Sequence, residues 1–76
     1  MNNSYSTDDQ AFLVAVGQTI RDFRLEAGLS QEAFARACGL DRTYISDVER
    51  GERNLSLLNL KKIADGLKVS MSALIS

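Results

Sequence analysis

The sequence predicts an all-α fold, a single compact domain of five helices. Apolar residues recur every three or four positions along most of the 76 residues, which is helical spacing. No proline interrupts these segments, and four of them follow a serine or aspartate that can cap a helix. Four of the five glycines stand where a helical pattern stops, which suits the left-handed conformation common at helix ends.

The first helix is expected from Asp8 to Ala27, after a flexible N-terminal extension of residues 1–7, so that residues 8–76 form the domain. Its buried face would carry apolar side chains three or four residues apart: Phe12, Val16, Ile20, Phe23 and Ala27. Gly17 lies inside this helix, where glycine costs about 1 kcal/mol against alanine. It marks either the close approach of another backbone or nothing of consequence.

Four shorter helices are expected over residues 31–38, 42–50, 57–66 and 71–75. Gly39 would end the second helix and Gly66 the fourth. Their inward-facing positions hold apolar or small residues: Phe34, Ala35, Cys38, Ile45, Val48, Leu57, Leu60, Ile63, Ala64 and Leu67. We interpret Cys38 as a small core residue rather than a redox switch, because no neighbouring cation in the sequence would lower its pKa.

The second and third helices are joined by only three residues, Gly39, Leu40 and Asp41. A tight, glycine-containing turn of this length is typical of a helix-turn-helix unit. Ala35 is small enough for the two helices to cross closely, and Ile45 and Val48 would fill the wedge between them. The alternative is a packed helical hairpin that binds no ligand.

The stretch LSQEAFARACGLDRTYISDVERG resembles the lambda-repressor-like, Cro-type helix-turn-helix domain of bacterial and phage regulators, over about residues 16–75. Within that family, LDRTYISDVERGERNLSL is most similar to the controller proteins of restriction–modification systems. The resemblance implies a small homodimeric regulator that binds double-stranded DNA operators upstream of its own gene and the endonuclease gene, with two dimers on adjacent sites. The alternatives are a helix-turn-helix antitoxin or protein-interaction module, or a phage-type repressor.

Candidate base contacts lie on the outward face of the third helix: Arg42, Thr43, Ser46 and Asp47. The first part of such a helix enters the major groove, where Arg42 could bond to guanine and the Thr43 methyl could meet thymine. Ser46, one turn further, could reach a base edge or a phosphate. Asp47 has two open interpretations: it accepts a hydrogen bond from cytosine, or it repels phosphates at wrong sites.

Candidate contacts to the DNA backbone lie on and around the same helix: Gln31, Tyr44, Arg50, Arg53 and Asn54. Gln31 opens the second helix, where its side-chain amide and the free backbone N–H groups can hold a phosphate oxygen. The family resemblance implies DNA contact for Arg53 and Asn54. It also implies a structural ion pair between Arg24 and Glu49, which would remove Glu49 from the DNA surface. Glu52 is expected to be a solvated loop residue.

Dimerisation is expected because one recognition helix reads only a few base pairs. Leu58, Met71 and Ile75 do not fit the core faces of their helices, so they are expected to form a self-complementary apolar patch. Packing into the core at the end of the domain is the alternative for these three residues.

Composition argues against other classes of function. The chain has no histidine, no glycine-rich phosphate loop and no metal-ligand cluster, so no enzyme activity, metal or cofactor is expected. No apolar run approaches the roughly 20 residues of a membrane span, and the N-terminus lacks the features of a signal peptide, so a cytoplasmic protein is expected. The net charge of −1 argues against nonspecific coating of nucleic acid. No small-molecule effector is expected, because no sensor domain follows.

Overall fold

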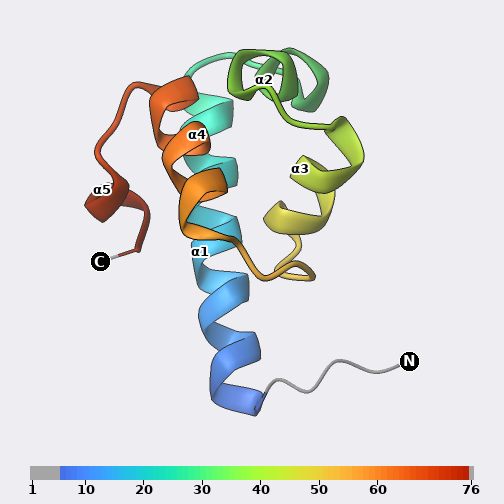
Figure 1. Ribbon diagram of the computed structural model, residues 1–76, viewed down its shortest axis with the longest axis vertical. Helices are drawn as coiled ribbons and strands as arrows, with labels where there is room; N and C mark the ends of the chain where they lie inside the picture. Colours follow the sequence, from blue (N-terminus) through green and yellow to red (C-terminus); the bar gives the residue numbers. More distant parts are fainter. Residues whose placement is uncertain (1–5, 76) are drawn as a thin grey trace.

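The computed structural model describes residues 6–75, and this part of the chain holds five α-helices and no strand. The helices are α1 (Thr7–Glu26), α2 (Gln31–Cys38), α3 (Arg42–Glu49), α4 (Leu57–Leu67) and α5 (Met71–Ile75) (Figure 1). The predicted all-α class and number of helices are confirmed. None of the described helices has the length and apolar character needed to cross a membrane.

Each helix begins at a residue whose side chain accepts a backbone N–H of the first turn. Ser30, Asp41 and Ser56 cap α2, α3 and α4, with bonds of 3.0 Å in each case. Ser6 caps α1 by accepting the Asp9 N–H at 3.1 Å. The helix therefore begins one residue earlier than expected, and Ser6 and Thr7 belong to it rather than to a flexible extension. Residues 1–5 lie outside the described part of the chain.

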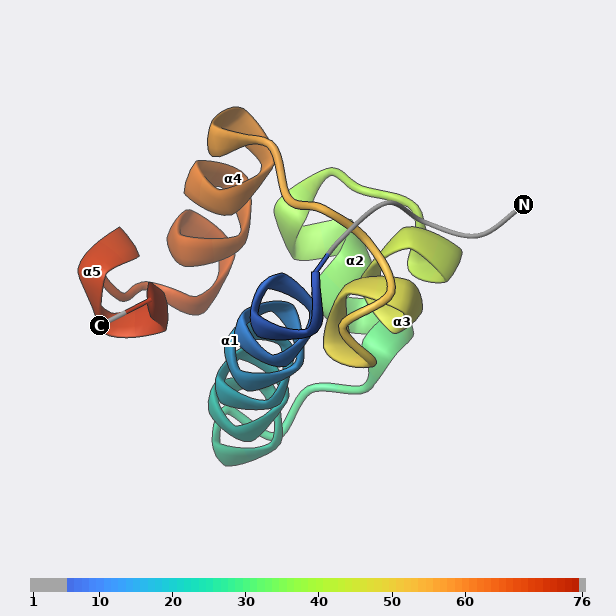
Figure 2. The same cartoon turned by 90° about the horizontal axis from the view of Figure 1, so that it is seen from below.

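Helix α1 is the longest helix and lies between α3 and α5 (Figures 1 and 2). Helices α2 and α3 pack on each other, α2 also contacts α4, and α1 contacts both α3 and α5. The core between them is filled by large, fully buried apolar side chains from every helix: Phe34, Ile20, Ile45, Ile63, Leu74 and Val48. In both views α3 lies on one side of α1 and α5 on the other.

Three residues expected on buried faces are exposed instead. Phe12 is 54% exposed, because the N-terminal part of α1 projects beyond the other helices (Figure 1). Leu57 is 75% exposed in the first turn of α4, where the chain has just left the loop that follows α3. Ala27 is exposed because α1 has ended and the chain turns toward α2. Helical spacing therefore does not predict how far other helices cover the apolar face of a helix.

Two glycines allow helices to approach closely. A Cβ atom on Gly17 would meet the Val48 carbonyl oxygen and would lie 2.8 Å from that of Glu49, so α1 crosses the α3 backbone at this point. Of the two interpretations of Gly17, the close approach of another backbone is therefore the correct one. Gly66 does not end α4 as expected. It lies within the helix, where a Cβ would lie 2.7 Å from the Cys38 sulfur, and Lys68 takes the left-handed position instead, with φ 62°.

Candidate nucleic-acid interface

The turn between α2 and α3 has the geometry that the spacing predicted. Gly39 adopts φ 69°, and the Leu40 N–H donates to the Ala35 carbonyl at 3.0 Å, which closes the end of α2. Asp41 follows at once and caps α3. Ala35 is 3% exposed, so a larger side chain here would force the two helices apart. The recognition helix is thus fixed at both its start and its crossing with α2.

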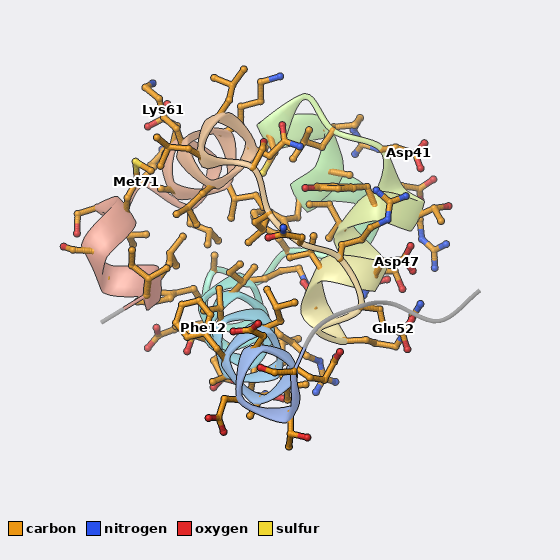
Figure 3. The ribbon with its side chains drawn as sticks, turned by 60° about the horizontal axis from the view of Figure 1, so that its bottom comes forward. Phe12, Asp41, Asp47, Glu52, Lys61 and Met71 are labelled. Carbon is orange, nitrogen blue, oxygen red and sulfur yellow. The ribbon has the colours of Figure 1, made fainter. Side chains whose placement is uncertain are left out.

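The outward face of α3 carries the four predicted base-contact residues. Arg42 and Thr43 are exposed in the first turn, and Ser46 and Asp47 are half-buried one turn later. Ile45 and Val48 are buried beneath them. Figure 3 shows Asp41, Asp47 and Glu52 along this one side of the molecule, opposite Lys61 and Met71. The structure therefore brings the candidate base contacts together on a single exposed face.

Arg50 follows α3 and bonds to three side-chain oxygen atoms. Its Nη1 donates to the Ser46 hydroxyl at 2.6 Å, and its Nη2 donates to Asp47 at 2.6 Å and to Glu52 at 3.2 Å. The Glu52 carboxylate, followed by that of Asp47, raises the pKa of the Arg50 guanidinium above its ordinary value. Glu52 is an exposed loop residue, as expected, with its side chain 58% exposed, and it also pairs with Arg50.

Arg53 and Tyr44 form a second contact on the same face. The Arg53 guanidinium lies 4.9 Å from the centre of the Tyr44 ring, and its Nε lies 3.6 Å from the second oxygen of Asp47. The Tyr44 hydroxyl accepts a hydrogen bond from Asn59 of α4 at 3.0 Å. Asn54 is exposed and lies apart from this contact, beside Phe12 and Leu13 of α1.

Arg24 and Glu49 form a buried ion pair that joins α1 to α3. The two bonds run from Arg24 Nε to Glu49 Oε2 at 2.6 Å and from Nη2 to Oε1 at 3.0 Å. The third nitrogen, Nη1, donates to the Leu29 carbonyl at 2.8 Å. Gln31 also donates to Glu49 Oε1 at 3.0 Å, a bond that the sequence did not indicate. The side-chain amide nitrogen of Gln31 is therefore engaged by Glu49 in a half-buried contact.

A polar groove of about 550 Å³ runs between α1 and α3. Gln31, Ser46 and Arg50, all candidate DNA contacts, line it together with Arg21. Arg21 was not among the predicted site residues, although it lies one helical turn before Arg24 and so on the same side of α1. This cation extends the candidate interface from α3 onto α1.

The expected dimer patch is only partly exposed. Leu58 and Ile75 are 62% and 45% exposed, whereas Met71 is half-buried and packs against the core. Ile75 also lines an apolar pocket of about 180 Å³ with Phe12, Leu13 and Leu60. The exposed Phe12 thus extends the patch onto α1.

Other site chemistry is limited in the described residues. Residues 6–75 hold no group of three side chains able to bind a metal ion. Cys38 is buried, and burial raises the pKa of its thiol to about 11. A thiol that stays protonated is unreactive, as expected for a core residue.

Comparison with known proteins gives the family. A family model described as helix-turn-helix matches residues 20–74. The chain belongs to the helix-turn-helix family. It is 47% identical to the control protein C.MunI of Mycoplasma sp, over 83% of this chain and 86% of that protein. It is 46% identical to a hypothetical transcription factor of Neisseria meningitidis serogroup B, over 83% of this chain, and spans 59% of that protein's length.

A solved structure gives the same fold. The restriction–modification controller protein C.Esp1396I, crystallised as a tetramer with its natural 35-base-pair operator, matches with a TM-score of 0.74. The two sequences are 47% identical over 78% of each chain. The helix-turn-helix of α2 and α3 is therefore embedded in a family fold that includes a DNA-bound controller protein.

Proposed function

We propose that this protein is a sequence-specific transcription regulator that binds a palindromic or pseudo-palindromic operator as a homodimer and controls restriction–modification genes, including its own. The observation that carries the proposal is the exposed polar face of α3 in a chain 47% identical to a controller protein crystallised on its operator. Binding to DNA in a bacterial cell would place the protein in the cytoplasm.

The recognition helix is suited to the major groove. Its first turn exposes Arg42 and Thr43, and the cap at Asp41 fixes the start of the helix. A bidentate arginine–guanine contact is worth about 1–3 kcal/mol of discrimination. Ser46 and the cations that follow the helix stand further along the same face, where the phosphates flank the groove. Direct readout is thus concentrated at the start of α3, and backbone contacts at its end.

Dimerisation is supported by the positions of α3 and α5. They lie on opposite sides of α1 (Figure 2), in a molecule of 32 × 25 × 21 Å. A two-fold axis beside α5 would therefore hold two α3 helices far apart, and half-sites one turn of DNA apart need about 34 Å. Exposed Phe12 and Ile75 line one apolar pocket, and exposed Leu58 adds apolar area on α4.

Selection of binding sites from a random duplex pool at two salt concentrations tests the proposal. We expect a palindromic consensus with half-sites one helical turn apart. Two such sites side by side would hold two dimers. Enrichment of no sequence at low salt would overturn the proposal. The alternative that an acidic chain suggests is a protein-interaction module. Such a module would keep binding its partner after Arg42→Ala, whereas a DNA-binding protein would lose discrimination at one base pair.

A further inference from the structure

The face of α3 and the loop that follows it carry as many carboxylates as cations. Arg42, Arg50 and Arg53 stand with three acidic residues: Asp41, Asp47 and Glu52. Asp41 is committed to capping the helix. The other two carboxylates contact the arginines that are candidate phosphate contacts. A DNA-binding surface would gain affinity without them, so their presence calls for a role.

Asp47 is the shared partner of both arginines. One carboxylate oxygen lies 2.6 Å from Arg50 Nη2, and the other lies 3.6 Å from Arg53 Nε. The Asp47 side chain is 22% exposed, while those of Arg50 and Arg53 are 53% and 50% exposed. The carboxylate thus lies beneath the two guanidinium groups, which remain open to the outside.

We propose, on the basis of the proposed function, that Asp47 is a positioning residue that holds Arg50 and Arg53 for operator phosphates and weakens their binding to random DNA. Each arginine is held on a second side as well. Arg50 donates to Ser46, and Arg53 lies over the Tyr44 ring. Asp47 joins these two contacts into one frame across the end of the recognition helix.

The geometry argues against a direct base contact by Asp47. Both of its oxygens already face an arginine, so a cytosine amino group would have to displace one of them. The arginines, in contrast, keep donors for DNA. A guanidinium has five N–H groups, and the contact of Arg53 with Asp47 is made through Nε alone. Phosphate oxygens can therefore bind Arg53 without breaking its contact with the carboxylate.

The same frame would affect operator and random DNA in opposite directions. Binding to random duplex depends on the charge presented to phosphates, and the logarithm of its affinity falls by about 0.9 per neutralised phosphate for each tenfold rise in salt. A carboxylate beside the arginines reduces the positive charge presented to phosphates, and so reduces affinity for random duplex. On an operator, base contacts fix the register of the protein, and arginines already held in place lose less side-chain freedom on binding. Asp47 would thus raise the ratio of operator to random affinity.

The test is Asp47→Asn, which keeps the shape of the side chain and removes its charge. Affinity is measured over a range of salt for the palindromic duplex recovered by the selection above and for a scrambled duplex of equal length. Asp65→Asn is the matched control. It also removes an aspartate from a surface ion pair, with Lys61 at 2.8 Å, and Lys61 lies far from Asp47 (Figure 3).

We expect Asp47→Asn to raise affinity for the scrambled duplex several-fold and to steepen its salt dependence by about 0.9 per protomer, because each protomer gains one formal charge. Operator affinity should fall several-fold, so that the ratio of the two affinities falls about tenfold or more. Asp65→Asn should leave the ratio unchanged. Thermal unfolding of both variants near that of the wild type would show that the fold is intact.

Either of two results for Asp47→Asn would overturn the proposal. Equal increases in both affinities would mean that Asp47 acts only through its charge. A changed preference at one base pair, with the ratio otherwise kept, would mean that Asp47 reads a base directly. If the wild type selects no sequence at all, the proposed function fails and this role fails with it. If it selects an operator and the ratio is unchanged in Asp47→Asn, only this role fails.

Discussion

Truncation of Glu49 should strongly destabilise the fold, because this residue of α3 is half of a buried ion pair. The Arg24 and Glu49 side chains are 8% and 2% exposed, so Glu49→Ala leaves a buried guanidinium with only its bond to the Leu29 carbonyl. Breaking a buried ion pair by removing one partner costs about 3–5 kcal/mol. In a domain of this size each kcal/mol lowers the melting temperature by about 4–8 °C, so we expect a fall of at least about 12 °C.

Thermal unfolding followed by far-ultraviolet circular dichroism measures this loss. The control is Asp22→Ala on α1, which removes an exposed carboxylate bonded to Gln18 and should cost less than about 0.5 kcal/mol. The double variant Arg24→Met/Glu49→Leu removes both buried charges and should regain most of the stability. A Glu49→Ala protein within about 1 kcal/mol of the wild type would refute the assignment of a stabilising buried pair, as would a double variant no more stable than the single one.

Three further substitutions and the behaviour of the Cys38 thiol test other parts of the structure. Gly17→Ala should lower the free energy of unfolding by about 1–2 kcal/mol in urea titrations, because strain against the α3 backbone exceeds the gain in helix propensity. Arg42→Ala should remove about 1–3 kcal/mol of discrimination at one operator base pair, measured against single-base variants of the site. Ile75→Asp should shift a dimer to monomer in sedimentation at tens of micromolar, and a monomeric wild type there would refute the patch. The Cys38 thiol should resist alkylation below pH 9 until the protein unfolds; above its ordinary pKa of 9.0 stability should decline toward pH 11, because the unfolded thiol ionises first.

Local signals in the sequence predicted the helices well. Ser30, Asp41 and Ser56 are caps because their side chains bond to N–H groups two or three residues ahead, a contact that depends on no other part of the fold. Phe12 and Leu57 were misjudged for the opposite reason. Helical spacing places a residue on a face, but the covering of that face depends on where a neighbouring helix ends, which the spacing does not contain.

The site was predictable to the extent that its contacts are local. The contact between Asp47 and Arg50 is an i,i+3 pair on one helix surface and could have been expected from the sequence. The return of Arg53 to the same carboxylate depends on the path of the loop. The bond from Gln31 to Glu49 depends on the crossing of α2 and α3. The close approach of Gly66 to Cys38 depends on the packing of α4 against α2. These non-local contacts needed the structure.

The net negative charge of the chain says little about DNA binding, because the positions of the charged side chains matter more than their sum. Salt at 0.1 M screens charges beyond about 10 Å, so a phosphate responds to the groups beside it and not to the total. Glu49 is buried against Arg24, and Asp65 pairs with Lys61 on the other side of the molecule. What remains near α3 is a surface of equal and opposite charges, with the arginines more exposed than Asp47. Such a surface would attract random DNA weakly, and an operator would have to supply base contacts before its phosphates were bound.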